Sequence, residues 1–342
     1  MTKPFVSVLI DTYNHEKYIE QCVVSAIEQD FPSSEYEIVV VDDGSTDKTP
    51  KIVRKFGPRV RLIMKGNGGQ ASAFNAGFQE SRGGILAFLD GDDWFAQGKL
   101  SAVIEMLAKV PDVAAVGHGY YRFDDQTGQT EEHVLAKRNV LNLNTPADAR
   151  EAHKSWSCML MGALTVRRNA IEKVMPVPEA LRFCADVPIV MAALLGGVAI
   201  IEKPFFYYRH HANNLFSLQE QRGVHLKRRA EMTLLAFDQA EAMLLKLGAR
   251  QECIEAFLHL QWVETSRLAL SNFGGSRGQL FKTEMRAFRT TNLNPRLAYR
   301  IFKYVVVGAA ALALTPRQFY KVRQWYGQKD LGRLRERLAK SH

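Results

Sequence analysis

The first 90 residues alternate between short apolar runs rich in β-branched residues and stretches whose apolar residues recur at helical spacing. The predicted strands cover residues 4–10, 36–43, 60–65 and 85–90. The predicted helices between them cover residues 15–31, 44–57 and 70–83. This alternation predicts an α/β fold with a mostly parallel, Rossmann-like sheet and helices on both faces. The near-continuous apolar character of the strands fits a sheet that is covered on both sides.

The rest of the chain predicts a second, helical region. Residues 112–150 are less regular, and near residue 216 the sequence changes to long amphipathic stretches. We therefore expect an α/β domain over residues 1–216 and a helical C-terminal region with a basic tail over residues 217–342. The chain shows no internal repeat and no low-complexity segment.

Cysteine usage and the N-terminus both favour a cytoplasmic protein. The four cysteines have no CxxC spacing, which argues against a disulfide framework or a structural zinc site and suits a reducing compartment. The N-terminal apolar run is six residues long, too short for the core of a signal peptide.

Acidic residues stand where three of the four predicted strands end. In a parallel sheet, ligands bind at the carboxyl ends of the strands. These acids are Asp11, Asp42, Asp43, Asp90, Asp92 and Asp93. Asp90 and Asp92 are two residues apart in the segment FLDGDDWF, a spacing that turns both carboxylates toward one side at a strand end. Oxygen ligands of this kind suit a hard divalent cation, Mg²⁺ or Mn²⁺.

Four segments resemble a known family when they are taken in this order and spacing. VSVLIDTYNHEKYIEQCVVSAIEQDF, IVVVDDGSTDKT, NGGQASAFNAGF and ILAFLDGDDW are similar to the inverting family 2 glycosyltransferases, which have the GT-A fold. The resemblance covers about residues 4–215. It implies transfer of a sugar from a nucleotide-diphosphate sugar, UDP-linked, to an acceptor hydroxyl with inversion, in polysaccharide or glycolipid biosynthesis. The implied acceptor is a sugar, a glycan or a lipid-linked glycan, and the implied cofactor is Mn²⁺ or Mg²⁺, which neutralises the diphosphate leaving group.

The resemblance identifies Asp90-Gly91-Asp92 as the DxD element of the family. It implies that Asp92 is a direct metal ligand and that Asp90 lies near the ribose or the metal. Gly91 allows the chain to bend and the ligand to approach. Asp93 either supports this site or caps a helix expected after Trp94.

The nucleotide is expected at the ends of the first two strands. The resemblance implies that Asp43 accepts a hydrogen bond from the base and that Tyr13 lies against it, with Thr12 beside them; the alternative for Tyr13 is a packing role. Relatives more often have Pro or Thr where this chain has Asp11, which we still assign to the donor site. Asp42 is also explained as ordinary turn chemistry before Gly-Ser.

A segment of the type NxGxxxAxN follows the third strand. The resemblance implies that Asn67, Gly69 and Asn75 shape the nucleotide pocket, together with Gly68 and Ala73. The alternative is a glycine turn that leads into a helix.

An inverting transfer needs one general base, and Asp186 in FCADVPIVMAAL lies where relatives place it. The acid that usually precedes this residue is replaced by Ala185. A carboxylate in a cleft has its pKa raised by burial and by neighbouring acids, which suits a base. The alternative is that Asp186 is a helix N-cap before Pro188.

The segment YYRHHANN resembles the YRxHxxN segment that closes the family's site. It implies that Arg209 pairs with the phosphate charge and that His211 touches the diphosphate or the metal. A structural role for His211 is the alternative.

The C-terminal region has an unusual charge balance. Residues 277–342 contain 15 Lys and Arg but three acids. The apolar run at residues 304–314 is 11 residues long, whereas a spanning helix needs about 20. With its basic and aromatic flanks, the segment 296–326 suits a helix on the inner face of an anionic membrane. A buried core helix is the main alternative; no nucleic-acid motif accompanies the bases.

Two other functions compete with sugar transfer. Ala185 in place of the usual acid suggests a catalytically silent GT-A protein that binds a nucleotide sugar or acts as a scaffold. A nucleotidyltransferase on a similar sheet requires a Gly-rich, basic phosphate loop after the first strand, and DTYNHEKY does not supply one.

Overall fold

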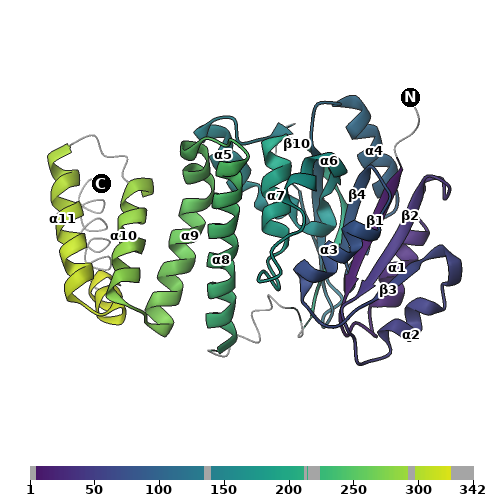
Figure 1. The fold of residues 1–342 in the computed structure, drawn as a ribbon, viewed down its shortest axis with the longest axis horizontal. Coiled ribbons are helices and arrows are strands. Elements are labelled where there is room, and N and C mark those ends of the chain that lie inside the picture. The colour runs from purple at the N-terminus through teal and green to yellow at the C-terminus, as the bar shows by residue number, and fades with distance from the viewer. Residues whose placement is uncertain (1–4, 135–139, 212–213, 215–223, 292–296, 325–342) are drawn as a thin grey trace, which may run out of the picture. The chain divides into compact units, whose positions relative to one another are not determined.

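The computed structural model describes residues 5–134, 140–211, 214, 224–291 and 297–324 (Figure 1). Its internal contacts divide the chain into two compact units. The first comprises Met1–Gln221 and Leu235–Phe257, and the second comprises Arg222–Leu234 and Leu258–His342. This division passes through two long helices, and the boundary expected at residue 216 stays a prediction.

The first unit contains the predicted parallel sheet. Its parallel strands are β1 (Val6–Thr12), β2 (Tyr36–Asp42), β3 (Arg61–Met64) and β4 (Ile85–Asp90). They lie in the order β3-β2-β1-β4, and every neighbouring pair is parallel. The predicted strands at 36–43, 60–65 and 85–90 agree with these bounds within two residues, because each is a short apolar run that ends at a polar turn.

The sheet continues with a mixed half that sequence periodicity describes less well. The order after β4 is β9-β6-β10-β5, with β6 and β10 parallel to each other and β9 and β5 antiparallel to their neighbours. These strands are β5 (Trp94–Phe95), β6 (Ala115–Asp124), β9 (Thr165–Arg167) and β10 (Val198–His210). Two short strands, β7 (Thr130–His133) and β8 (Val140–Leu141), pair with β6 and β10 respectively.

Helices cover both faces of the sheet, as the sequence predicts. On one face of the sheet, Val8 of β1, Val40 of β2 and Ala87 of β4 pack in one core with buried side chains of α1 (Ile19–Ile27) and α4 (Lys99–Lys109). On the other face, α3 (Gln70–Glu80) places Phe74 against Phe88 of β4, with ring centroids 5.4 Å apart. The unit also contains three short helices and one buried helix: α2 (Thr49–Arg54), α5 (Pro146–Lys154), α6 (Arg168–Ile171) and the buried α7 (Asp186–Leu195). The long helices α8 (Val224–Lys246) and α9 (Gln251–Phe273) follow along the chain.

The strand register brings the acids to one edge of the sheet. Asp11 lies opposite Asp90, and Thr12 lies opposite Asp42. Because parallel strands end on the same side, the residues that follow β1, β2 and β4 share the carboxyl edge.

The second unit has its own apolar core, formed largely by α10 (Arg277–Thr291) and α11 (Leu297–Ala313). Phe319 and Tyr320 are 7% exposed within this core, so the structure contradicts their expected place among membrane-facing aromatics. The Tyr320 hydroxyl donates to the buried Glu284 carboxylate at 3.0 Å, which satisfies the polar end of the ring. Among the described residues, no helix combines the length and the apolar character needed to cross a membrane.

Candidate active site

Asp90 and Asp11 form an acid pair at the carboxyl edge. Their carboxyl groups share a hydrogen bond, and the buried Oδ1 of each has no hydrogen-bond partner. Burial and the charge of Asp92 raise the pKa of Asp90 to about 7. Burial and the neighbouring Asp90 raise the pKa of Asp11 well above its usual value. The pair therefore holds carboxylate oxygens whose ionised form lacks a compensating charge.

Asp92 differs from Asp90 because two histidines face it. His211 Nε2 lies 3.0 Å from Asp92 Oδ2, and His15 Nε2 lies 4.0 Å from the same oxygen. The hydrogen bond with His211 and the two imidazole rings lower the pKa of Asp92 against the effect of its burial. The predicted pairing of Asp92 and His211 in one site thus agrees with the geometry. His15 was not predicted; its position three residues after Thr12 at the end of β1 was the available signal.

Gly91 is required by the close approach of the first loop. A Cβ atom at this position would lie 2.6 Å from Thr12 Oγ1 and 2.8 Å from His15 Nδ1. The 3.3 Å contact between these two atoms closes the same space. Gly91 therefore lets the DxD turn lie directly against the end of β1.

Asp93 does not cap a helix. The two residues after it form β5, and α4 begins five residues later at Lys99 with Gly98 at its N-cap. The Asp93 carboxylate instead accepts the backbone N–H of Arg209 at 2.7 Å, which ties the DxD turn to β10. The helix-cap interpretation is therefore wrong, and the supporting role fits the contact.

Arg209 is buried and contacts several residues at the DxD turn. Its Nε donates to the carbonyl of Asp92 at 2.8 Å, and its Nη1 donates to Asp125 at 2.8 Å. Its second terminal nitrogen donates to Gln21 Oε1, and the guanidinium lies 4.5 Å from the centre of the Trp94 ring. Arg209 is 6% exposed, and each of its three nitrogens already has a protein partner. Its expected pairing with phosphate stays a prediction. Its place in the structure indicates that it positions Asp92.

Asp43 anchors the loop that follows β3. Its Oδ1 accepts Lys65 Nζ at 2.6 Å, and its Oδ2 accepts the N–H of Gly69 at 2.6 Å. The N–H of Gly68 also donates to Oδ1, at 2.9 Å. Asp42 makes the expected turn, because its Oδ1 accepts the N–H groups of the next glycine and serine. The expected hydrogen bond from Asp43 to a base stays a prediction.

The glycine segment turns into α3, as the alternative interpretation expected. Gly69 has φ of 86°, and a Cβ there would lie 2.8 Å from the carbonyl oxygen of Arg182. Asn67 Oδ1 accepts Arg182 Nη2 at 2.5 Å. Gln70, the first residue of α3, was not predicted: it donates to Asp90 and accepts the N–H of Ala185 at 3.3 Å. One side chain therefore joins the DxD element to the start of α7.

Asn75 connects α3 to a distant loop instead of facing the open edge. Its Nδ2 donates to the Val177 carbonyl at 2.8 Å, and its Oδ1 accepts the Val177 N–H at 2.7 Å. The residue is 8% exposed, and both ends of its amide are used. Its contribution to the pocket is therefore to fix the backbone near Val177.

Tyr13 and Thr12 flank the acid pair from the end of β1. The Tyr13 side chain is 44% exposed, which leaves its ring available to a planar ligand, whereas Thr12 is 2% exposed. The expected contact of Tyr13 with a base stays a prediction.

Asp186 is the first residue of α7, and Ala185 occupies the N-cap without a side-chain hydrogen bond. Burial raises the pKa of Asp186 to about 6, although hydrogen bonds from the N–H groups of Asp186 and Val187 oppose this shift. The charge of Asp186 also contributes to the raised pKa of Asp90. The structure thus brings Asp186 into electrostatic range of the DxD element. Asp186 is the first helical residue and Ala185 is the N-cap, so the N-cap alternative is wrong, and the role of general base stays a prediction.

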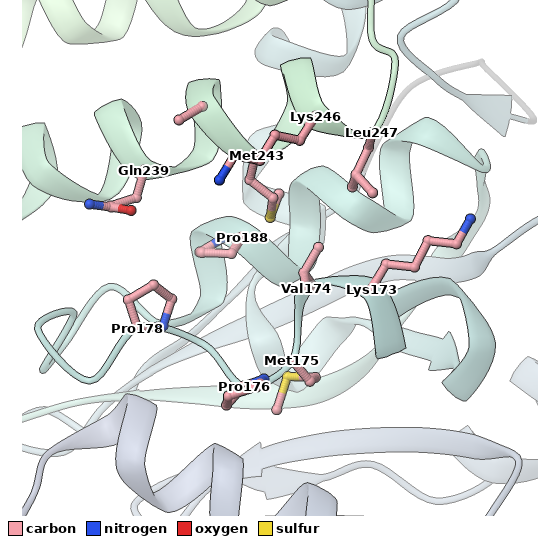
Figure 2. A pocket seen from close by; sticks show the side chains of 11 residues that line it. Lys173, Val174, Met175, Pro176, Pro178, Pro188, Gln239, Met243, Lys246 and Leu247 are labelled. Atoms are coloured by element: carbon pink, nitrogen blue, oxygen red, sulfur yellow. The ribbon is translucent and has the colours of Figure 1, made fainter.

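The described residues contain no ready-made group of three or more His, Cys, Asp or Glu side chains arranged around a metal. The oxygen ligands present nevertheless suit a divalent cation, because Asp90 and Asp11 each have a buried carboxylate oxygen without a hydrogen-bond partner. Two surface cavities, of about 270 and about 220 Å³, are not lined by Asp90, Asp92 or Asp186. The larger lies between α8 and the start of α7, where Met243 is near Pro188 (Figure 2).

Comparison with known proteins agrees with this geometry. The sequence pattern of the family described as Glycosyl transferase family 2 matches residues 7–175. An uncharacterised glycosyltransferase of Nostoc sp., alr2836, is 32% identical over 219 residues, which are 62% of this chain and 67% of that protein. The chain belongs to glycosyl transferase family 2. The uncharacterised glycosyltransferase EpsJ of Bacillus subtilis is 28% identical over 62% of this chain and 63% of EpsJ. The glycosyltransferase AglE of Haloferax volcanii is 32% identical over 54% of this chain and 60% of AglE. The matched region thus spans less than two thirds of EpsJ and AglE.

A solved structure extends the family's fold over more of the chain. The structure of S. aureus TarS 1–349 in complex with UDP-GlcNAc has a TM-score of 0.56 and covers 90% of both chains at 18% identity. The mostly parallel sheet, its flanking helices and the helical C-terminal region therefore form a TarS-like GT-A fold, as the sequence predicts.

Proposed function

We propose that this family 2 glycosyltransferase moves a sugar from a nucleoside diphosphate sugar to an acceptor hydroxyl with inversion at the anomeric carbon. The observation that carries the proposal is the meeting of Asp90, Asp92 and Asp186 at one edge of the sheet, where the charges of Asp92 and Asp186 act on Asp90. Two acids suit the diphosphate end of a donor, and a third acid on a separate helix suits proton abstraction from an acceptor.

A uridine nucleotide is the proposed donor component. TarS, which shares the fold, is described in complex with UDP-GlcNAc. In this chain, the exposed Tyr13 ring would lie against the base, and Asp43, held by Lys65 and Gly69, would receive a base N–H on a remaining lone pair. Thr12, Asp11, Asn67 and Asp90 would complete the nucleotide side. In this proposal, Arg209 and Asn75 act by fixing the loops that carry these residues.

Asp186 is the proposed general base. Its carboxylate would accept the proton of the acceptor hydroxyl while that oxygen attacks the anomeric carbon. A pKa of about 6 leaves most of the Asp186 carboxyl ionised at neutral pH yet makes it more basic than an ordinary aspartate. Ala185 in place of the usual acid leaves the Asp186 carboxylate itself present, and Gln70 Oε1 accepts the backbone N–H of Ala185.

Mg²⁺ or Mn²⁺ is the proposed cofactor. Asp92 and Asp90 would hold it, with His211 beside Asp92, and the bound cation would supply charge neutralisation of the diphosphate leaving group. The chain's own task is to keep Asp92 ionised and in place. The His211 contact and the hold of Arg209 on the Asp92 carbonyl serve that task.

The proposed setting is the cytoplasm, in the biosynthesis of a polysaccharide or glycolipid with a glycan or lipid-linked acceptor. Cys22 and Cys253 are buried free cysteines, as a reducing compartment allows. Cys158 lies outside the residues whose side chains are described.

Donor binding tests the proposal without knowledge of the acceptor. We expect a UDP-sugar with Mn²⁺ to raise the thermal midpoint of the full chain more than GDP- or dTDP-sugars do. Asp92→Asn should lose the metal-dependent part of this shift, while Asp112→Asn, at an exposed loop position, should keep it. Protection by no nucleotide sugar at any metal concentration would contradict the proposal. Tight binding without turnover would instead support the silent-scaffold alternative.

A further inference from the structure

Helix α11 has two different faces. On one face, Gly308, Ala311 and Leu314 pack in the core of the second unit; a Cβ at Gly308 would lie 3.3 Å from a ring carbon of Phe281. This close packing against α10 confirms part of the core-helix interpretation of the sequence. It accounts for one face of the helix only.

The opposite face is apolar and exposed. Val305, Val306 and Leu312 are 59%, 49% and 54% exposed, and Ala309 and Ala313 are exposed between and beside them. Their spacing of one, four, seven and eight residues from Val305 is that of a single helical stripe. We call these five residues the α11 stripe. Scattered apolar side chains are normal on a protein surface, but a continuous stripe marks a contact surface.

The charge of the sequence that flanks the stripe selects its partner. Residues 285–329 contain nine Lys and Arg and no Asp or Glu. The acid just before this span, Glu284, is 3% exposed and is neutralised by Arg267 and Arg323. The sequence of α11 and of the helical residues 316–324 therefore offers bases without acids, including the exposed Arg317 and Lys321. A second copy would set like charges against each other, whereas an anionic surface is attracted.

The length of the stripe defines how the helix meets a bilayer. α11 has 17 residues, one face of which is committed to the protein core, and no described helix can cross a membrane. We propose that the α11 stripe lies flat on an anionic membrane, with its apolar side chains at the headgroup–acyl boundary and the surrounding bases near lipid headgroups. The proposal does not depend on the identity of the donor or on catalysis.

This surface differs from the one that the sequence favours. Phe319 and Tyr320 belong to the core, and the ends of the predicted segment, residues 296 and 325–326, lie outside the described residues. The contact surface is thus the outer face of α11.

Vesicle binding by the full chain tests the proposal. We expect the wild type to co-sediment with phosphatidylcholine vesicles that contain phosphatidylglycerol and to bind pure phosphatidylcholine far more weakly. The triple variant Val305→Gln, Val306→Gln, Leu312→Gln should reduce binding to the anionic vesicles about 10-fold or more, because three apolar anchors are lost. The double variant Leu245→Gln, Leu268→Gln is the matched control, since these leucines are 45% and 53% exposed outside the stripe.

Three results decide the outcome. Unchanged thermal midpoints and helical circular dichroism establish that both variants are folded. Loss of vesicle binding by the triple variant, with a control variant that binds like the wild type, supports the proposal. Equal vesicle binding by the triple variant and the wild type would overturn it. Wild-type dimers that the triple variant dissociates, without vesicle binding, would also overturn it and assign the stripe to a second copy.

Discussion

Asp90→Asn should stabilise the metal-free protein while it removes the function of the site. Asp90 lies opposite Asp11 in the strand register, and the charges of Asp92 and Asp186 also act on it. The buried Oδ1 of Asp90 has no hydrogen-bond partner. An uncharged amide of the same shape relieves this repulsion.

The magnitude follows from the pKa. The pKa of Asp90 is raised from 3.8 to about 7. This shift corresponds to roughly 4 kcal/mol at about 1.4 kcal/mol per pKa unit, which is an upper bound because the group titrates together with its neighbours. Because the folded-state pKa is the higher one, wild-type stability is fully present below about pH 4 and is lost progressively as pH rises to about 7. The stabilisation by Asp90→Asn should therefore be near zero only below about pH 4, be less than half of its full size at pH 5, and reach several degrees in thermal midpoint at pH 8.

The assay is thermal unfolding in EDTA at pH 5, 6, 7 and 8, repeated with Mn²⁺. Added Mn²⁺ should stabilise the wild type most at pH 8 and should stabilise Asp90→Asn little. Asp112→Asn, at an exposed position, should follow the wild type throughout. A variant that is less stable than the wild type at pH 8 in EDTA, or a difference that does not vary with pH, would refute the reasoning.

Three other substitutions separate chemistry from support. Asp186→Asn should abolish turnover and leave the donor Kd within about 2-fold, which steady-state kinetics and calorimetry check. The wild-type kcat/KM should rise with pH through about 6 as the Asp186 carboxyl ionises. Arg209→Lys should lower the free energy of unfolding by about 2–4 kcal/mol, because Asp125 and the Asp92 carbonyl lose a planar donor, and the apparent Mn²⁺ affinity should fall with it. Asn75→Ala should cost about 1–3 kcal/mol in urea unfolding, since both backbone groups of Val177 lose a partner, and turnover by the folded fraction should persist.

The parallel half of the sheet and its acidic edge follow from local signals. Each strand is one apolar run, and each acid stands where its run ends, so strand order was not needed to place Asp90 and Asp92 on the same edge. Gly91 was predictable for the same reason, although the atoms that require it, on Thr12 and His15, were not.

The supporting residues depend on pairings that no local pattern carries. The resemblance of YYRHHANN implied that Arg209 pairs with phosphate, but its partner Asp125 is 84 positions away and meets it through the pairing of β6 and β10. Asn75 meets Val177 across 102 positions. The apolar run of α11 was visible in the sequence, but the face that is buried was decided by packing against α10.

Release of a nucleoside diphosphate from a donor tests the central claim most directly. The full chain is incubated with UDP-, GDP- and dTDP-sugars and Mn²⁺, and the wild type is compared with Asp92→Asn and Asp186→Asn. We predict UDP release by the wild type that EDTA suppresses and that both variants lose. Release at an equal rate in excess EDTA or by Asp92→Asn, or no release from any donor that the protein binds, would contradict the assignment of this edge as a metal-dependent sugar-transfer site.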